Sequence, residues 1–171
     1  MLARLWRAGN VESQHRGAWV QVDTSGRVID GEGDWNHPVF ARSATKALQA
    51  LPLLESGAAE RFKFTDDELA LALASHHGEE QHVRRVEALL QRLGLQPGDL
   101  QCGAQNPVDL DARKALTRSG ARPTAVHNNC SGKHTGFLAL ALHLGVDKAR
   151  YLDPEAAPQQ MVRRAVEELS G

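Results

Sequence analysis

The sequence predicts an α+β fold in which a small antiparallel sheet is followed by a helical region. Residues 1–40 carry short extended runs separated by glycines, which is typical of strands. From residue 43 onward, apolar residues recur at helical spacing, and several of these runs end at a glycine. The length of 171 residues suits one domain, strand-rich over 1–40 and helical over 43–171.

The strand-rich part contains one predicted hairpin. In AWVQVD, apolar and polar residues alternate, with Trp19, Val20 and Val22 as the larger apolar side chains. Ser25 and Gly26 form a turn signal, after which RVID resumes the extended pattern. Two strands joined by a tight turn are therefore expected between residues 18 and 30.

The first helices are predicted from apolar spacing and a capping signal. SATKALQALPLLES places Leu48, Leu51 and Leu54 on one helical face. Pro52 lies inside this run, so we expect a kink or an early end there. Thr65-Asp-Asp-Glu68 is a capping-box sequence, and we expect a helix to follow it.

The later helices are predicted from apolar faces and closing glycines. A helix over 80–93 is expected to bury Val83, Val86, Leu89, Leu90 and Leu93 and to end at Gly94. Further helices are expected in LDARKALTRSG, in KHTGFLALALHLG and in PQQMVRRAVEELSG.

Composition excludes several classes of protein. A formal charge of -1 gives no electrostatic reason to bind nucleic acid or an anionic membrane. No run is apolar for long enough to cross a bilayer, and the start lacks a secretory signal. Two cysteines, Cys102 and Cys130, do not form a disulfide framework. We therefore expect a cytoplasmic protein with neither nucleic acid nor membrane as a partner.

Ser43 and Lys46 form an S-x-x-K spacing. On a helix, this spacing puts two side chains on one face, one turn apart. The lysine amine could then take the serine proton, provided that burial or a nearby positive charge lowers its pKa. The spacing is also common by chance, and a serine near a helix start with a solvated lysine explains it as well.

A second cluster, SHHGE, follows an apolar helix. Ser75 could be a second nucleophile or a hydrogen-bond donor, His76 or His77 could transfer protons, and Glu79 could bind an amine. A helix terminus explains the same residues, since Gly78 breaks the run and Glu79 begins the next helix near its positive end.

The densest cluster is HNNCSGKH, at residues 127–134. Its backbone N–H groups and asparagine amides could hold a carboxylate at a helix N-terminus. Cys130 could bind zinc as a thiolate, whereas Lys133 would first have to lose its proton. Cys130 could equally be a small buried hydrophobe. Cys102, in LQCGAQNP, is interpreted as a buried structural thiol in a tight loop.

Taken in order, these clusters resemble the rhizobial-type L-asparaginase II family. The resemblance runs from about residue 9 to the end, and NNCSGKH is its most specific part. It is carried by Glu12-Ser13 with His15-Arg16-Gly17, Arg42-Ser43-x-x-Lys46, Ser75-His76-x-Gly78-Glu79 and Asn128-Asn129-Cys130-Ser131-Gly132-Lys133-His134. The segments LQALPLLESGAAERF, DLQCGAQNP and YLDPEAAPQQ also look familiar.

The resemblance implies a serine β-lactamase- or glutaminase-like fold and hydrolysis of L-asparagine to L-aspartate and ammonia. It implies catalytic roles for Ser43, Lys46 and Ser75, and a homodimer. We expect the substrate to contact Arg42, His76, Glu79 and Asn129. The resemblance also implies a zinc ion, held by Cys130 and Lys133, that shapes the substrate pocket.

Two departures from the family pattern bear on these expectations. Ala47 stands where the family usually has proline, with little expected consequence. Family chains are roughly twice as long, so a further cysteine ligand and a later catalytic lysine are expected beyond Gly171. The chain then reads as the N-terminal part of an asparaginase domain, inactive as a fragment. The alternatives are another S-x-x-K acyl-serine hydrolase, or a truncated non-catalytic paralogue that binds an amino acid or zinc.

Overall fold

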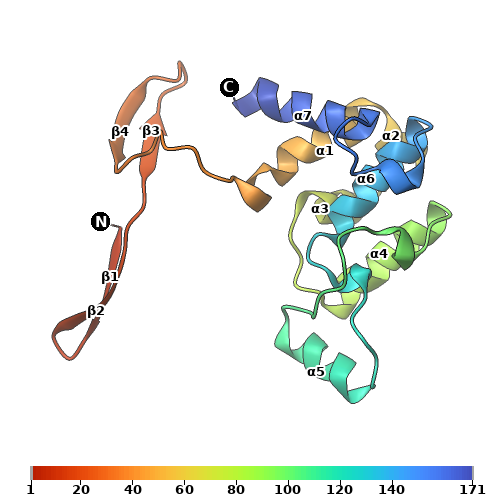
Figure 1. Ribbon diagram of the computed structural model, residues 1–171, viewed down its shortest axis with the longest axis horizontal. Coiled ribbons are helices and arrows are strands. Elements are labelled where there is room, and N and C mark those ends of the chain that lie inside the picture. The colour runs from red at the N-terminus through yellow and green to blue at the C-terminus, as the bar shows by residue number, and fades with distance from the viewer. Residues whose placement is uncertain (1, 171) are drawn as a thin grey trace. The chain divides into compact units, whose positions relative to one another are not determined.

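The computed structural model describes residues 2–170 and divides the chain into two compact units, residues 1–40 and 41–171. Within the described residues, the first unit carries the four strands and the second carries the seven α-helices, so the predicted α+β class is confirmed. Figure 1 shows the strands in the red N-terminal part and the helices from orange to blue. No described helix is both long and apolar enough to span a membrane.

The first unit consists of two separate hairpins. β1 (Ala3–Arg7) pairs with β2 (Asn10–His15), and β3 (Trp19–Val22) pairs with β4 (Val28–Glu32), both antiparallel. The hairpin predicted around Ser25 and Gly26 is therefore confirmed. Gly26 has a φ of +80°, and the Asp23 carboxylate accepts hydrogen bonds from the backbone N–H groups of Ser25 and Arg27. The structure has two two-stranded sheets where the sequence indicated one small sheet.

The second unit is built around one enclosed helix, α6 (Ser131–His143). Its middle residues, Phe137 to Ala141, are buried on all sides, as expected for a helix that is apolar around its whole circumference. The helices packed on it are α1 (Lys46–Glu55), α2 (Ala58–Arg61), α3 (Asp66–Leu73), α4 (Glu80–Arg92) and α7 (Ala157–Ser170). Figure 1 shows α1 and α2 on one side of α6 and α3 and α4 on the other. α5 (Leu110–Arg118) has no buried residue.

The local signals position most helix ends. Both hydrogen bonds of the capping box are present: the Thr65 side chain accepts from the Glu68 backbone N–H, and the Glu68 carboxylate accepts from the Thr65 backbone N–H. The helix α3 begins there as predicted. The helix predicted over 80–93 is α4, and Gly94 follows it with a φ of +70°. The predicted helices near 110–118, 133–143 and 157–170 are α5, α6 and α7.

Two expectations about α1 need correction. The helix does not end at Pro52: α1 continues to Glu55, and the proline is buried. The alternative expectation, a kink at Pro52, stays a prediction. The α-helix also begins later than the sequence indicated. Residues 42–45 form a 3₁₀ turn, η1 (Arg42–Thr45), and Lys46 is the first residue of α1. The remaining short elements, which the sequence did not predict, are α2, η2 (Pro97–Asp99), η3 (Ala125–His127) and η4 (Lys148–Arg150).

Candidate active site

Lys46 is a buried amine at the start of α1, with only 2% of its surface exposed. Its Nζ atom donates to the Ser75 hydroxyl at 2.6 Å and to the Ala74 carbonyl at 2.8 Å. Neither acceptor is a carboxylate, so these two hydrogen bonds join the amine to a hydroxyl and a backbone carbonyl. The sequence suggested a direct contact between Lys46 and Ser43. The structure instead gives Lys46 a hydrogen bond to Ser75, and Ser43 contacts Ser75.

Ser43 completes a row of three polar side chains. The Ser75 and Ser43 hydroxyl oxygens lie 3.2 Å apart, so Ser75 connects the lysine to Ser43. Both serines are exposed, whereas the lysine is enclosed. A proton can pass from one end of such a row to the other through the central hydroxyl. We call Lys46, Ser75 and Ser43 the serine–lysine row.

The backbone on each side of the row departs from helical geometry. Arg42 has a φ of +49°, in the left-handed region that a residue with a Cβ enters at a cost. Ala74, just before Ser75, has an extended backbone that ends α3 and turns the chain toward Lys46. Both serines are therefore held at bends and not within regular helix.

His76 is buried directly beside the row. Its Nε2 lies 2.8 Å from the Ser131 hydroxyl, and its Nδ1 accepts from the backbone N–H of Gly78 at 3.1 Å. Burial, with smaller contributions from His82 and Lys46, lowers the pKa of His76 to about 4. The imidazole is therefore neutral at physiological pH.

The HNNCSGKH segment surrounds the start of α6. The Asn128 side chain accepts from the N–H of Cys130 at 2.9 Å and donates to the carbonyl of Cys102 at 2.9 Å. Burial lowers the pKa of Lys133; the neighbouring Cys130 opposes this change and Lys46 adds to it. The Lys133 ammonium also lies 5.4 Å from the centre of the Phe137 ring.

A close approach of two helices brings this segment next to the row. A Cβ atom added to Gly132 would lie only 2.4 Å from the Leu71 carbonyl oxygen, so only glycine lets α6 approach the end of α3 this closely. Ser75 follows α3, and Cys130 immediately precedes α6. The backbone N–H of His76 donates to the Asn129 carbonyl at 3.1 Å, and the His76 ring lies 2.8 Å from the Ser131 hydroxyl, so the two segments are in direct contact.

A family model described as L-asparaginase II matches residues 3–171 of the chain. The chain belongs to the L-asparaginase II family. Among curated proteins, no relative matches the chain. Membership in this family indicates an asparaginase-like amide hydrolase that acts on a small molecule.

In this L-asparaginase II chain, the predicted substrate contacts lie in different settings. Arg42 is exposed and adjoins Ser43. Glu79 is half-buried, and its carboxylate accepts from the Gln81 amide at 2.6 Å. Asn129 uses its backbone carbonyl to accept from the N–H of His76. His76 is the member of this set with the least access to a ligand, since it is 4% exposed.

A zinc ion can be tested against the chemistry of the donors. Cys130 and Lys133 are both half-buried and stand one turn apart at the start of α6, so a thiolate and a neutral amine could face one ion. Among residues 2–170, no group of three or more His, Cys, Asp or Glu side chains gathers as a metal site requires. Zinc at Cys130 and Lys133 therefore stays a prediction.

Cys102 has the properties of a structural thiol. Burial raises its pKa to about 11, and its sulfur donates to the Ala125 carbonyl at 3.5 Å. Both cysteines are free thiols. The interpretation from the sequence agrees with this setting, except that Cys102 is half-buried and not fully enclosed.

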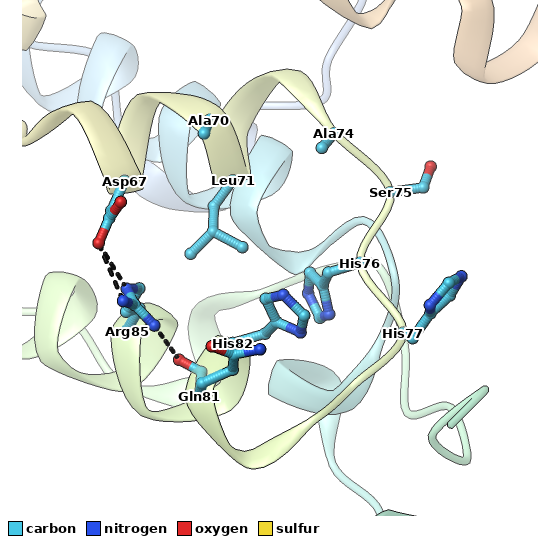
Figure 2. A pocket seen from close by; sticks show the side chains of 10 residues that line it. All are labelled: Asp67, Ala70, Leu71, Ala74, Ser75, His76, His77, Gln81, His82 and Arg85. Atoms are coloured by element: carbon cyan, nitrogen blue, oxygen red, sulfur yellow. Dashed lines mark hydrogen bonds and ion pairs between the residues drawn. The ribbon is translucent and has the colours of Figure 1, made fainter. Parts of the chain in front are cut away.

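Sequence reasoning missed a cavity of about 370 Å³ between α3 and α4. Figure 2 shows Leu71, His82 and Arg85 around this space, with the Ser75 hydroxyl pointing away from it. The His76 and His82 rings stack with centroids 5.2 Å apart, and Arg85 pairs with Asp67. His82 and Arg85 lie on the same face of a predicted helix as Val86 and Leu89, a spacing that could have suggested a polar pocket above the core.

Proposed function

We propose that this protein is an L-asparaginase that hydrolyses L-asparagine to L-aspartate and ammonia in the cytoplasm, as a homodimer. The observation that carries the proposal is the serine–lysine row, in which a buried amine contacts one serine and, through it, a second. A serine becomes a useful nucleophile when a neighbouring base takes its proton. Family membership directs the chemistry toward an amide.

Ser43 is the attacking group in this proposal. It lies at the exposed end of the row, next to the left-handed Arg42 and in the 3₁₀ turn that leads directly into α1. A helix N-terminus carries partial positive charge, which stabilises the oxyanion that forms when an amide carbonyl is attacked. Ser75 occupies the middle of the row and relays the proton.

The reaction then proceeds in two halves. The Ser43 oxygen bonds to the side-chain amide carbon of asparagine, its proton passes to Ser75, and the Ser75 proton passes to a neutral Lys46 amine. The carbon–nitrogen bond breaks as the proton returns along the row to the departing nitrogen, which leaves as ammonia. Water hydrolyses the resulting ester to aspartate and restores the Ser43 hydroxyl.

Recognition of the amino acid falls to charged and amide groups around the row. The Arg42 guanidinium suits the α-carboxylate, because this pair forms two parallel hydrogen bonds. Glu79 suits the α-ammonium group, and Asn129 borders the Cys130 side of the site. Cys130 and Lys133 would hold zinc, whose contribution when bound is to shape the pocket around the substrate.

Two other functions share the same row. A glutaminase- or β-lactamase-like hydrolase would use the same serine chemistry on a different acyl group, and a non-catalytic paralogue would bind an amino acid or zinc without turnover. The HNNCSGKH segment beside the row favours the asparaginase, since β-lactam hydrolysis by a serine and a lysine needs no thiol.

The test compares ammonia release from L-asparagine and from L-glutamine with opening of a β-lactam, all with the full-length protein. Preferential turnover of asparagine, lost in Ser43→Ala and kept in the matched surface variant Ser119→Ala, supports the proposal. A faster reaction with glutamine or with the β-lactam would make that compound the substrate in place of asparagine. Absence of all three reactions would contradict the proposal that the protein is a hydrolase. Mass spectrometry of trapped acyl-enzyme identifies the nucleophile, and acylation at Ser75 would reassign it.

The piece consisting of residues 1–171 should release ammonia poorly when purified by itself. Cys130 and Lys133 supply fewer protein ligands than the three usual in zinc sites that act on substrate. Weak metal retention and turnover far below about 1 s⁻¹, the lower end for typical enzymes, are expected. Robust turnover by this piece would show that its residues suffice.

A further inference from the structure

The hydrogen bonds around His76 determine which of its ring nitrogens carries the proton. The Ser131 hydroxyl donates to the Val126 carbonyl at 3.0 Å, so its oxygen is available to accept from His76 Nε2–H at 2.8 Å. On the other side of the ring, the Gly78 N–H points at Nδ1 at 3.1 Å, so Nδ1 must be an acceptor. The ring is therefore neutral, with its proton on Nε2.

The same residue is also tied through its backbone. The His76 N–H donates to the Asn129 carbonyl at 3.1 Å, so one residue contacts the segment before α6 through both main chain and side chain. Ser131 is fully buried, and the ring is 4% exposed. Both ring nitrogens are used internally, which leaves neither for a ligand.

The chain after His76 is equally constrained. Gly78 has a φ of +77°, and a Cβ there would lie 3.0 Å from Pro107 Cα and 3.2 Å from the His127 carbonyl oxygen. The His77 carbonyl accepts from the N–H of Asp109 at 2.9 Å. The segment after Ser75 therefore cannot shift without breaking several close contacts.

We propose that His76 is a positioning residue that holds Ser75 against Lys46 by donating to Ser131. Ser75 is the residue directly before His76, and its hydroxyl must stay 2.6 Å from the amine and 3.2 Å from Ser43 for the row to transfer a proton. A misplacement of about 1 Å can cost roughly 100-fold in rate. His76 thus acts on the reaction through Ser75 and does not contact the substrate. This role rests on the asparaginase proposal.

Two substitutions separate the two ring contacts. In His76→Gln, the side-chain amide reaches Ser131 as a donor but the acceptor for Gly78 is lost. In His76→Asn, the shorter side chain keeps an acceptor near Gly78 but cannot reach Ser131. Ser131→Ala removes the acceptor alone. His77→Asn is the matched control, because His77 is exposed and contributes its backbone carbonyl.

Steady-state assays with L-asparagine should show kcat reduced about 10- to 100-fold in His76→Asn and Ser131→Ala, with KM changed less than about threefold. The double variant should be no slower than His76→Asn, His76→Gln should recover much of the rate, and His77→Asn should match wild type. The pH profile should keep its shape in every variant. Ser131→Ala deletes one oxygen atom and keeps the test available if a His76 variant fails to fold.

Three results would overturn the role. A raised KM with unchanged kcat in the His76 variants would make His76 a substrate contact. Loss of one limb of the pH profile would make it a proton carrier. Additive losses of rate in the double variant would show that His76 and Ser131 act independently. The rate of labelling by a fluorophosphonate, which reports an activated serine without any substrate, distinguishes the two proposals. If the wild-type protein is labelled fast but does not hydrolyse asparagine, and the variants are labelled slowly, the positioning role stands and asparagine is rejected as the substrate. A wild type that is not labelled would reject the activated serine and the positioning role together.

Discussion

In the first 40 residues, each strand has a partner for its backbone but leaves its apolar side chains in solvent, whereas in residues 41–171 the central helix is enclosed by its neighbours. Trp6, Val22 and Ile29 are all more than half exposed. Leu138 and Ala139 in α6 are completely buried. Two-stranded hairpins are marginally stable in water, so backbone pairing alone holds the first unit weakly.

The comparison also separates structure from chemistry. Every member of the serine–lysine row, and both proposed zinc ligands, lie in residues 41–171. Groups that must stay within a fraction of an ångström of each other require a packed core, because side-chain packing locks their rotamers. The following predictions test whether this unit carries both activity and stability.

The largest effect is expected from the row itself. Ser43→Ala, Lys46→Ala and Ser75→Ala should each reduce asparagine turnover by orders of magnitude in the full-length protein, because the proton path is broken. The Ser43→Ala/Lys46→Ala double variant should cost little more than either single change, since residues acting as a unit are not additive. Lys63→Ala is the control for loss of a lysine. Independent, additive losses, or near-normal activity in Ser75→Ala, would contradict the shared path.

A second prediction concerns Cys130, the proposed zinc ligand. Cys130→Ala should lower the amount of bound zinc and raise KM. Its effect on Tm should be smaller, because the thiol is only half-buried and precedes α6, whose buried residues begin at Ser131. Metal analysis and steady-state kinetics measure both. Cys102→Ala is the matched control and should retain zinc. A Cys130→Ala protein with unchanged zinc and KM would make the thiol a packing residue.

The contrast in burial predicts a contrast in stability. Leu138→Ala should lower the free energy of unfolding by about 2–5 kcal/mol, because it leaves a cavity in the core. Ile29→Ala, which is 59% exposed, should change it by less than about 0.5 kcal/mol. Urea titration of both variants measures the difference. Equal losses would mean that Ile29 is covered in solution.

The smallest effect is expected from the ion pair between the buried Glu68 and the partly exposed Arg92 in the helical unit. Burial alone would raise the pKa of Glu68, but hydrogen bonds from Arg92 and from the Thr65 backbone, with the charge of Arg92, bring it below the ordinary value of a glutamate. A carboxyl with a lowered pKa stabilises the fold above its unfolded pKa, and the stabilisation is lost as the pH falls through the folded pKa.

Glu68→Gln should therefore lower stability at neutral pH by about 1 kcal/mol or less, since Arg92 is partly exposed and solvent screens the pair. Below the folded pKa, the variant and wild type should converge. Thermal melts between pH 7 and pH 3 test this, with Glu87→Gln as an exposed control on α4. A constant difference at all pH values would attribute the effect to packing.

Much of the architecture could be predicted from local patterns. The turn at Gly26, the capping box at Thr65 and the end of α4 before Gly94 depend on neighbouring residues only, so the sequence predicted them correctly. The start of α1 was wrong, because whether residues 42–45 continue a helix or tighten into a 3₁₀ turn depends on packing around Lys46 and not on spacing.

By itself, the sequence determined the α+β class, the positions of most helices and the residue types available for chemistry. Only the tertiary structure decided which of these residues meet. Lys46 contacts Ser75 across 29 positions of sequence, and His76 contacts Ser131 across 55. The contact of His76 with Ser131 needs the close approach of α6 to the end of α3 that Gly132 allows, a condition set by the packing of two helices that no local pattern records.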